Sequence, residues 1–159
     1  MTMATALRPT RPEDLGFLQE VYAGTRADEL ARTPWSAEQK QAFVRMQFDA
    51  QHTYYRQQFA DAAYEVILLD GVPVGRLYTD RRADEIRILD IALLPEYRNC
   101  GIGSRYLRDI QEEAQQAGRA VRIHVEMFNP ARRLYDRMGF RPVQEDGVYL
   151  LMEWRADAA

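Results

Sequence analysis

The amino-acid sequence predicts an α/β protein in which helices flank one mixed sheet. Three observations favour this class. Segments with strand and helix periodicity alternate along the 159 residues, the first strands follow one another through tight turns, and one strand–helix–strand crossover comes after them. The length is typical of one domain, so we expect a single domain over residues 1–155 and a frayed tail at 156–159.

The N-terminal part predicts one short strand and two helices. Thr5–Arg8 fits a strand, and Pro12 suits the start of a helix, because the first turn does not need the N–H that proline lacks. Residues at helical spacing carry this helix to about Thr25. Ser36 is a good N-cap for a second, aromatic helix that reaches Phe59, and its length leaves open a bend or a division into two. The apolar face of the first helix comprises Leu15, Leu18, Val21 and Tyr22.

The next segment predicts a series of strands joined by turns. Tyr64–Leu69 is rich in β-branched and apolar residues, and Asp70-Gly71 is a hairpin signal that leads into a returning strand at Val72–Asp80. A third strand, Glu85–Leu94, ends at Pro95, which has no N–H for a sheet ladder.

The C-terminal part predicts two helices and three strands. A helix follows the glycine-rich loop after Pro95 and ends at Gly118, and a short helix follows Asn129-Pro130 and ends at Gly139. Strands are expected at Arg119–Glu126, Arg141–Glu145 and Val148–Glu153. The apolar stripe of the longer helix comprises Tyr106, Leu107, Ile110, Ala114 and Ala117.

Composition excludes several classes of protein. The formal net charge of −3 gives no general attraction to nucleic acid or to an anionic membrane. A single cysteine, Cys100, excludes an intramolecular disulfide, and with only His52 and His124 beside it no zinc pattern is met, so no metal is expected. No apolar run has the length of a signal peptide or a membrane span, and we therefore expect a cytoplasmic protein.

The segment Arg98-Asn99-Cys100-Gly101-Ile102-Gly103-Ser104 predicts an anion-binding loop. Its two glycines permit positive φ and a close approach of a ligand to the backbone. The loop opens a helix, whose first N–H groups point outward at the positive end of the helix dipole, and Arg98 can add charge-assisted hydrogen bonds. A plain tight turn into a helix is the alternative. Neither the dinucleotide-binding glycine pattern nor the P-loop pattern is present.

Two segments together resemble a known superfamily. Residues 90–103, DIALLPEYRNCGIG, resemble motif A of the GNAT superfamily of N-acetyltransferases, and residues 129–140, NPARRLYDRMGF, are similar to its motif B. The spacing of the two motifs and the order of elements also match, so the resemblance covers almost the whole chain. It implies a mixed, mostly antiparallel sheet of six to seven strands, flanked by about four helices, with splayed central parallel strands.

The resemblance implies that the protein binds acetyl-CoA and transfers its acetyl group to a primary amine. In the family, backbone of the first splayed strand pairs with the pantetheine arm, the loop binds the pyrophosphate, and an asparagine of motif B contacts the cofactor. Arg132 stands where a small residue is common, and it either crowds the cofactor or contacts its phosphates. The implied cofactor-binding residues are Ile91, Ala92, Leu93, Arg98, Asn99, Cys100, Gly101, Ile102, Gly103, Ser104, Asn129 and Arg132.

The catalytic residues that the resemblance implies include Tyr135, as the general acid that faces the leaving sulfur. The general base is open, because Leu89 stands where some members carry a glutamate. Asp90, His124 and Glu126 are the candidates, and His124 and Glu126 share one face of a strand. His124 also matches by position the catalytic glutamate of ribosomal-protein N-terminal acetyltransferases. Asp90 has two further possible roles, in fixing the strand and in binding the amine, and water is another candidate base.

The acceptor is expected to be a small-molecule amine. A protein or peptide N-terminus, and a non-catalytic CoA-binding sensor, are the alternatives, and the late strands offer an edge for a homodimer. Among the 21 basic residues only Lys40 is a lysine. This skew indicates either compositional bias or arginines that hold phosphate. Six of the arginines fall in the two motifs or in the helix that follows the first of them: Arg98, Arg105, Arg108, Arg132, Arg133 and Arg137.

Overall fold

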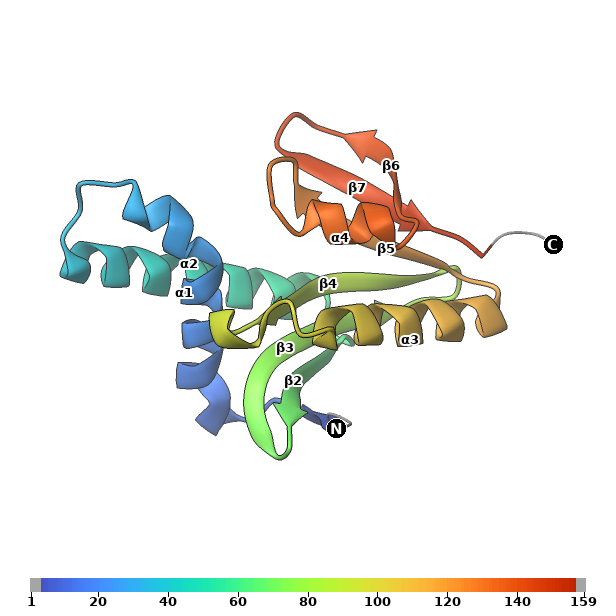
Figure 1. Ribbon diagram of the computed structural model, residues 1–159, viewed down its shortest axis with the longest axis horizontal. Coiled ribbons are helices and arrows are strands. Elements are labelled where there is room, and N and C mark those ends of the chain that lie inside the picture. Colours follow the sequence, from blue (N-terminus) through green and yellow to red (C-terminus); the bar gives the residue numbers. More distant parts are fainter. Residues whose placement is uncertain (1–3, 157–159) are drawn as a thin grey trace. The chain divides into compact units, whose positions relative to one another are not determined.

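The computed structural model describes residues 4–156, and these residues form a seven-stranded sheet with four α-helices and two short 3-10 helices (Figure 1). The strands are β1 (Thr5–Pro9), β2 (Ala63–Leu69), β3 (Val72–Arg81), β4 (Glu85–Leu93), β5 (Ala120–Glu126), β6 (Arg141–Glu145) and β7 (Tyr149–Trp154). The helices are α1 (Leu15–Ala31), α2 (Ala37–Gln58), α3 (Ile102–Ala117) and α4 (Arg132–Arg137), with 3-10 turns η1 (Pro12–Asp14) and η2 (Pro95–Tyr97). Of the predicted frayed tail, residues 157–159 lie outside the described part.

The sheet is mixed and mostly antiparallel, as the sequence predicts. Its strand order is β1-β2-β3-β4-β5-β7-β6. β1 pairs with β2, β5 with β7 and β6 with β7 in antiparallel fashion, whereas β4 and β5 run parallel because α3 connects them as a crossover. The predicted fold class is therefore confirmed.

The chain divides into two compact units. Unit 1 comprises the chain up to Leu77 together with Ala92–Arg98, and unit 2 comprises Tyr78–Ile91 and the chain from Asn99 onward. Strands β3 and β4 each contribute residues to both units. The expected single domain over residues 1–155 stays a prediction, and the units are described separately below.

In unit 1, α1 and α2 form a helical pair around buried aromatic and aliphatic side chains. Ser36 caps α2 with a reciprocal capping box, and α2 is one helix over its whole length rather than two. Helix α1 continues past the predicted end near Thr25, because Leu30 joins the core between the helices. Leu15 is 44% exposed, so its predicted place on the apolar face is wrong. The core between the helices comprises Leu18, Tyr22, Leu30, Val44 and Phe48.

In unit 2, α3 packs against β5 through its predicted stripe. Ile102, Tyr106, Leu107, Ile110 and Ala114 are buried, whereas Ala117 in the last turn of the helix is exposed, so its predicted place on the apolar stripe is wrong. Along β5, Val121, Ile123 and Val125 are buried, and Arg122, His124 and Glu126 alternate with them. Since side chains alternate across a strand, these three polar residues lie on the face opposite α3.

The parallel pairing of β4 with β5 is short. It runs from Glu85 opposite Ala120 to Ile88 opposite Ile123 and then stops, although both strands continue. Beyond that point β5 keeps its pairing with β7 through Glu126. The strands therefore separate after Ile88, as the resemblance implies.

Strand β4 also contains an extra residue relative to β3. The Arg82 amide donates to the Glu85 carbonyl near the hairpin, and the Leu94 amide donates to the Val74 carbonyl at the other end. These two hydrogen bonds belong to registers that differ by one residue, with the extra residue in β4. A β-bulge of this kind bends the strand and ends its regular pairing.

An ion pair fixes the start of α1 in unit 1. Both guanidinium nitrogens of Arg8 donate to the Asp14 carboxylate, at 2.7 and 2.8 Å, and the Arg11 amide donates to it at 2.7 Å. Arg8 is the main cause that lowers the pKa of Asp14 to about 2, from an ordinary value of 3.8, against the opposing effect of burial. Because the folded-state pKa is the lower one, the carboxylate stabilises the fold above pH 4 and loses this effect as the pH falls toward 2.

We therefore expect Asp14→Asn to lower the free energy of unfolding by about 2 kcal/mol at pH 7. The difference from the wild-type protein should shrink steadily between pH 5 and pH 2. Urea unfolding at a series of pH values measures it. A difference that stays constant over this range would contradict the assignment of this pKa to the Arg8–Asp14 pair.

Candidate functional site

The predicted anion-binding loop enters α3 through two residues with left-handed backbone. Asn99 has φ of 61° and Gly101 has φ of 86°, and Gly101 is the N-cap of the helix. Asparagine tolerates this conformation better than most residues, so it takes a position expected for glycine. Gly103 lies inside α3 and is not among the left-handed residues, so of the two glycines only Gly101 uses positive φ.

The N-terminus of α3 presents backbone amides without a capping side chain. Gly101 makes no side-chain cap, and the first turn contains no acidic residue. An α-helix leaves its first N–H groups without intrahelical partners, and here they belong to Ile102, Gly103 and Ser104. A Cβ built on Gly103 would meet nothing within 4 Å, so the approach to these amides is open. The geometry fits a phosphate or pyrophosphate.

Three of the predicted cofactor residues belong to unit 1. Ala92 is buried, and the carbonyl of Leu93 accepts a hydrogen bond of 3.2 Å from the Nε–H of Arg98. A Cβ on Gly75 would lie 2.4 Å from the Ala92 carbonyl oxygen, so only glycine allows β3 to pass so close to β4 here. Arg98 thus holds the end of β4 in addition to its predicted contact with pyrophosphate.

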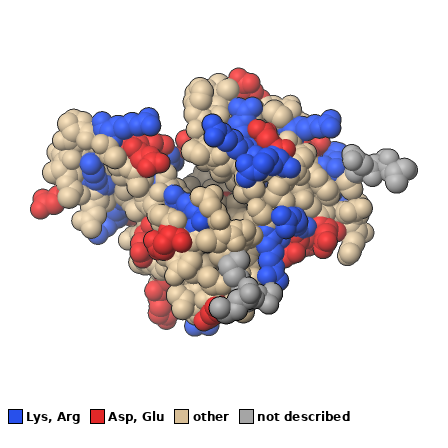
Figure 2. Space-filling view, viewed as in Figure 1, with Lys and Arg blue, Asp and Glu red and all other residues tan. Residues whose placement is uncertain are grey.

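In unit 2, the loop before α4 borders an open hollow of about 490 Å³. Asn129 and Arg132, both predicted to bind the cofactor, line it together. The Asn129 carbonyl oxygen Oδ1 accepts the Ala131 amide at 2.9 Å, and the Arg132 guanidinium donates to the Met127 carbonyl at 3.5 Å. The lining residues are Met127, Phe128, Asn129, Pro130, Arg132, Arg133 and Asp136. Figure 2 shows the basic side chains that gather over α4.

Tyr135 on α4 is buried, with 4% of its surface exposed. Its ring packs edge-on against Phe140 at 5.9 Å between centroids. Burial, and secondly the charge of Asp90 on β4, raise the pKa of the Tyr135 phenol far above its ordinary value. The group therefore stays protonated and can donate a hydrogen bond to a ligand.

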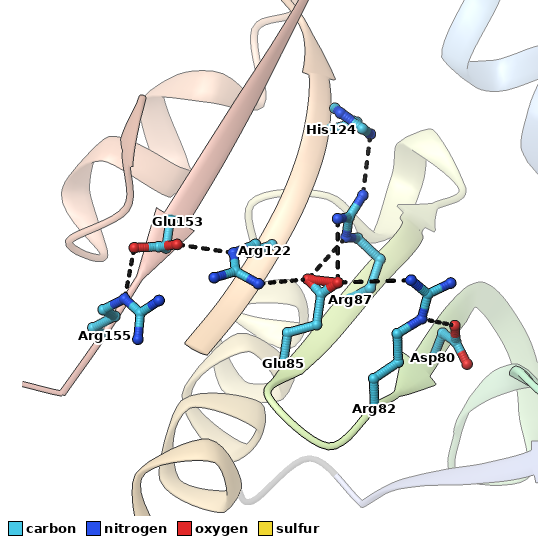
Figure 3. Close-up of polar contacts among 8 residues, drawn as sticks. All are labelled: Asp80, Arg82, Glu85, Arg87, Arg122, His124, Glu153 and Arg155. Atoms are coloured by element: carbon cyan, nitrogen blue, oxygen red, sulfur yellow. Dashed lines mark hydrogen bonds and ion pairs between the residues drawn. The ribbon is translucent and has the colours of Figure 1, made fainter. Parts of the chain in front are cut away.

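The base candidates His124 and Glu126 lie on the same face of β5, His124 exposed and Glu126 half-buried. Nη1 of Arg87 approaches Nδ1 of His124 at 3.4 Å (Figure 3). Partial burial and the Arg87 charge lower the pKa of His124, while Asp146 and Glu85 oppose them. His124 is accordingly neutral at pH 7.

Sequence reasoning missed the ion-pair network behind His124. Glu85 is 5% exposed and contacts three arginines, Arg82, Arg87 and Arg122 (Figure 3). The sequence feature that could have indicated this network is the alternation of polar residues along two predicted strands. Glu85 and Arg87 lie on one strand, and Arg122 and His124 on the other. The network became recognisable only once the strands were placed in register.

Comparison with known proteins identifies the family. A family model described as the acetyltransferase (GNAT) family matches residues 25–140. The chain belongs to this family. The match spans most of the chain and includes both sequence motifs, so the predicted family is confirmed.

One curated relative is the [ribosomal protein bS18]-alanine N-acetyltransferase of Haemophilus influenzae, 34% identical over 61 residues. The match covers 38% of this chain and 42% of the relative, so the chain spans less than half the length of the curated relative that it matches.

Solved structures share the fold along the whole chain. The PaiA N-acetyltransferase of Thermoplasma acidophilum, solved in complex with coenzyme A, superimposes with a TM-score of 0.73 at 22% identity and covers 97% of this chain and 100% of its own. The ribosomal-protein-S18-alanine N-acetyltransferase of Escherichia coli superimposes with a TM-score of 0.64 at 18% identity, over 98% and 96% of the two chains.

Two absences concern residues 4–156, the described part of the chain. No helix there is both long and apolar enough to cross a membrane. No group of three or more His, Cys, Asp or Glu side chains lies together in a way that could hold a metal ion in this part of the chain.

One substitution in the first turn of α3, with a matched control, tests whether this turn binds the pyrophosphate. Gly103→Glu places a carboxylate in the first turn of α3, where an acidic residue favours the helix but repels pyrophosphate. We expect CoA affinity to fall at least about tenfold with no loss of stability. Isothermal titration calorimetry with CoA and thermal unfolding measure the two effects.

Gly16→Glu is the control, because Gly16 is also the second residue of a helix with nothing within 4 Å of a built Cβ. It adds the same charge away from the loop and should leave CoA affinity unchanged. Equal CoA affinities for the two variants would contradict the assignment of the pyrophosphate site to the N-terminus of α3.

Proposed function

We propose that the protein transfers an acetyl group from acetyl-CoA to a primary amine by direct attack in a ternary complex, with a small-molecule amine as the acceptor. The observation that carries the catalytic assignment is Tyr135, a buried phenol held in its protonated form on the helix of motif B. A CoA-binding sensor has no use for such a donor. The proposal therefore favours an enzyme over a binding module.

The cofactor is assigned to the residues that the family resemblance implies. The amides of Asn99–Ser104, with Arg98, hold the pyrophosphate, and Asn129 and Arg132 contact the cofactor from the loop before α4. The backbone of Ile91, Ala92 and Leu93 pairs with the pantetheine amides. The separation of β4 from β5 after Ile88 supports this assignment, because strands that part leave backbone groups for another extended chain. Bound acetyl-CoA supplies an activated acyl group.

Proton transfers accompany the exchange of the C–S bond for a C–N bond. The amine must lose a proton. The candidate bases in unit 2 are His124, Glu126 and Asp90, which take the proton directly or through water. Tyr135 donates a hydrogen bond to sulfur as the C–S bond breaks. Because its pKa is raised well above that of a thiol, we expect it to stabilise the developing thiolate more than to protonate it fully.

Two classes of acceptor meet this chemistry. A small amine needs only an accessible nitrogen and loses little conformational freedom on binding, which favours it as the first candidate. A protein N-terminus is the second candidate, favoured by the local identity with the bS18-alanine N-acetyltransferase. Thiol release from acetyl-CoA, measured with a panel of small amines and with peptides that begin with alanine, separates the two. Higher kcat/KM for the peptides would replace the first candidate by the second, and no turnover on any amine would favour the sensor.

Tyr135→Phe tests the role of the phenol. The variant keeps the ring against Phe140 and removes the hydroxyl, so we expect kcat to fall about 100-fold or more while the Kd for CoA changes little. The wild-type kcat should show no loss from tyrosine ionisation up to pH 10, because the raised pKa keeps Tyr135 protonated there. Steady-state kinetics from pH 6 to 10 measure both.

Tyr64→Phe is the matched control. The single O–H of Tyr64 is shared between the carbonyls of Tyr55 and Phe59 in unit 1, at 2.9 and 2.8 Å. Its loss should cost about 1 kcal/mol of stability and leave kcat unchanged. An equal fall in kcat for both variants would assign the effect of Tyr135→Phe to packing rather than to chemistry.

A further inference from the structure

The contact between Arg87 and His124 determines which ring nitrogen carries the proton. Nη1 of Arg87 lies 3.4 Å from Nδ1 of His124. A guanidinium group has only donors and does not lose its proton in proteins, so Nδ1 must present its lone pair. In the neutral ring the proton is then on Nε2, and His124 offers an N–H at that edge.

Glu85 holds Arg87 in this position. Its carboxylate accepts from Nε of Arg87 at 3.2 Å and from Nη2 at 3.3 Å, so the guanidinium is bound as a fork and Nη1 is directed to the ring. The same carboxylate accepts from Arg122 at 3.2 Å, and Arg122 donates to Glu153 on β7 at 2.8 Å. The side chain of Glu85 is only 6% exposed, so this arrangement is fixed by burial as well as by charge.

The charges around His124 act against a second proton on the ring. Arg87 from β4 faces Nδ1, and a proton there would meet a guanidinium N–H. Glu85 from β4 and Asp146 from the turn before β7 favour the proton, but Glu85 is already shared among arginines. On β7 the residue opposite His124 is Leu151, which is apolar. On β5 itself, Arg122 and Glu126 lie two residues away on the same face.

We propose that Arg87 is a positioning residue that holds His124 as a hydrogen-bond donor, and that Glu126 takes the proton from the attacking amine. To act as the base, His124 would have to accept at Nδ1 and displace Arg87, or accept at Nε2, where a proton already resides. Glu126 lies on the same face two residues along β5. The Nε2–H of His124 is left to bind an oxygen of the acceptor. This inference rests on the proposed function and names the base within it.

The tautomer of His124 is measurable without any activity. In ¹⁵N-labelled protein, the Nδ1 and Nε2 shifts distinguish the two tautomers, and His52 is the only other histidine, so His52→Gln assigns the signals. We expect the wild-type His124 to carry its proton on Nε2. Arg87→Met should increase the population of the Nδ1–H tautomer of His124 and raise the pKa of His124. Arg155→Gln removes an arginine at the far end of the same network, where it contacts Glu153, and should leave both unchanged.

Kinetics test the division of roles between the two residues. Glutamine keeps an N–H donor but is no base, so His124→Gln should retain more kcat/KM than His124→Ala, which we expect to lose about tenfold. Glu126→Gln should lose about 100-fold or more. Equal losses for His124→Gln and His124→Ala, with a small effect of Glu126→Gln, would make His124 the base and overturn the proposal.

The outcomes separate this inference from the proposed function. An Nδ1–H tautomer in the wild-type protein, or no response to Arg87→Met, overturns the positioning role even in an active enzyme. If the protein acetylates no amine, the proposed function is overturned, whichever tautomer His124 adopts.

Discussion

The candidate site depends on a buried carboxylate that allows two arginines to lie side by side. Arg87 and Arg122 are directly opposite in the parallel pairing of β4 with β5, where two like charges repel each other. Glu85 accepts hydrogen bonds from both arginines, and Arg122 also donates a hydrogen bond to Glu153. Removal of Glu85 would leave the two guanidinium groups in register with no carboxylate between them, so the pairing of these strands and the position of His124 rest on one side chain.

The same strands serve two purposes along their length. From Glu85 to Ile88, β4 is hydrogen-bonded to β5 and stabilised by the charged network on one face and by the buried side chains of Ile86 and Ile88 on the other. After Ile88 the pairing ends, and it is there that the candidate catalytic residues Asp90, His124 and Glu126 are found. A firmly paired segment beside a separated one positions reactive groups on regular strands.

Much of the fold was predictable because the local signals agree with the tertiary structure. Ser36 caps a helix, Gly118 ends one, and β5 alternates apolar and polar residues as a strand covered on one face should. The loop before α3 and the short helix at Tyr135 were recognisable from their motifs. The predictions that failed concern tertiary placement: Leu15 and Ala117 fit an apolar stripe by spacing but lie where no neighbour covers them.

The contacts that set the chemistry of His124 were not predictable in the same way. Arg87 and His124 come from strands separated by a loop and a helix, and no spacing rule fixes the register between them. Hydrogen–deuterium exchange with and without CoA tests the central claim most directly. The account predicts slower exchange on CoA binding at Ile102–Ser104 and at Ile91–Leu93, with Glu85–Ile88 unchanged. Protection that leaves both of these segments unaffected and falls on β6 and β7 instead would contradict it.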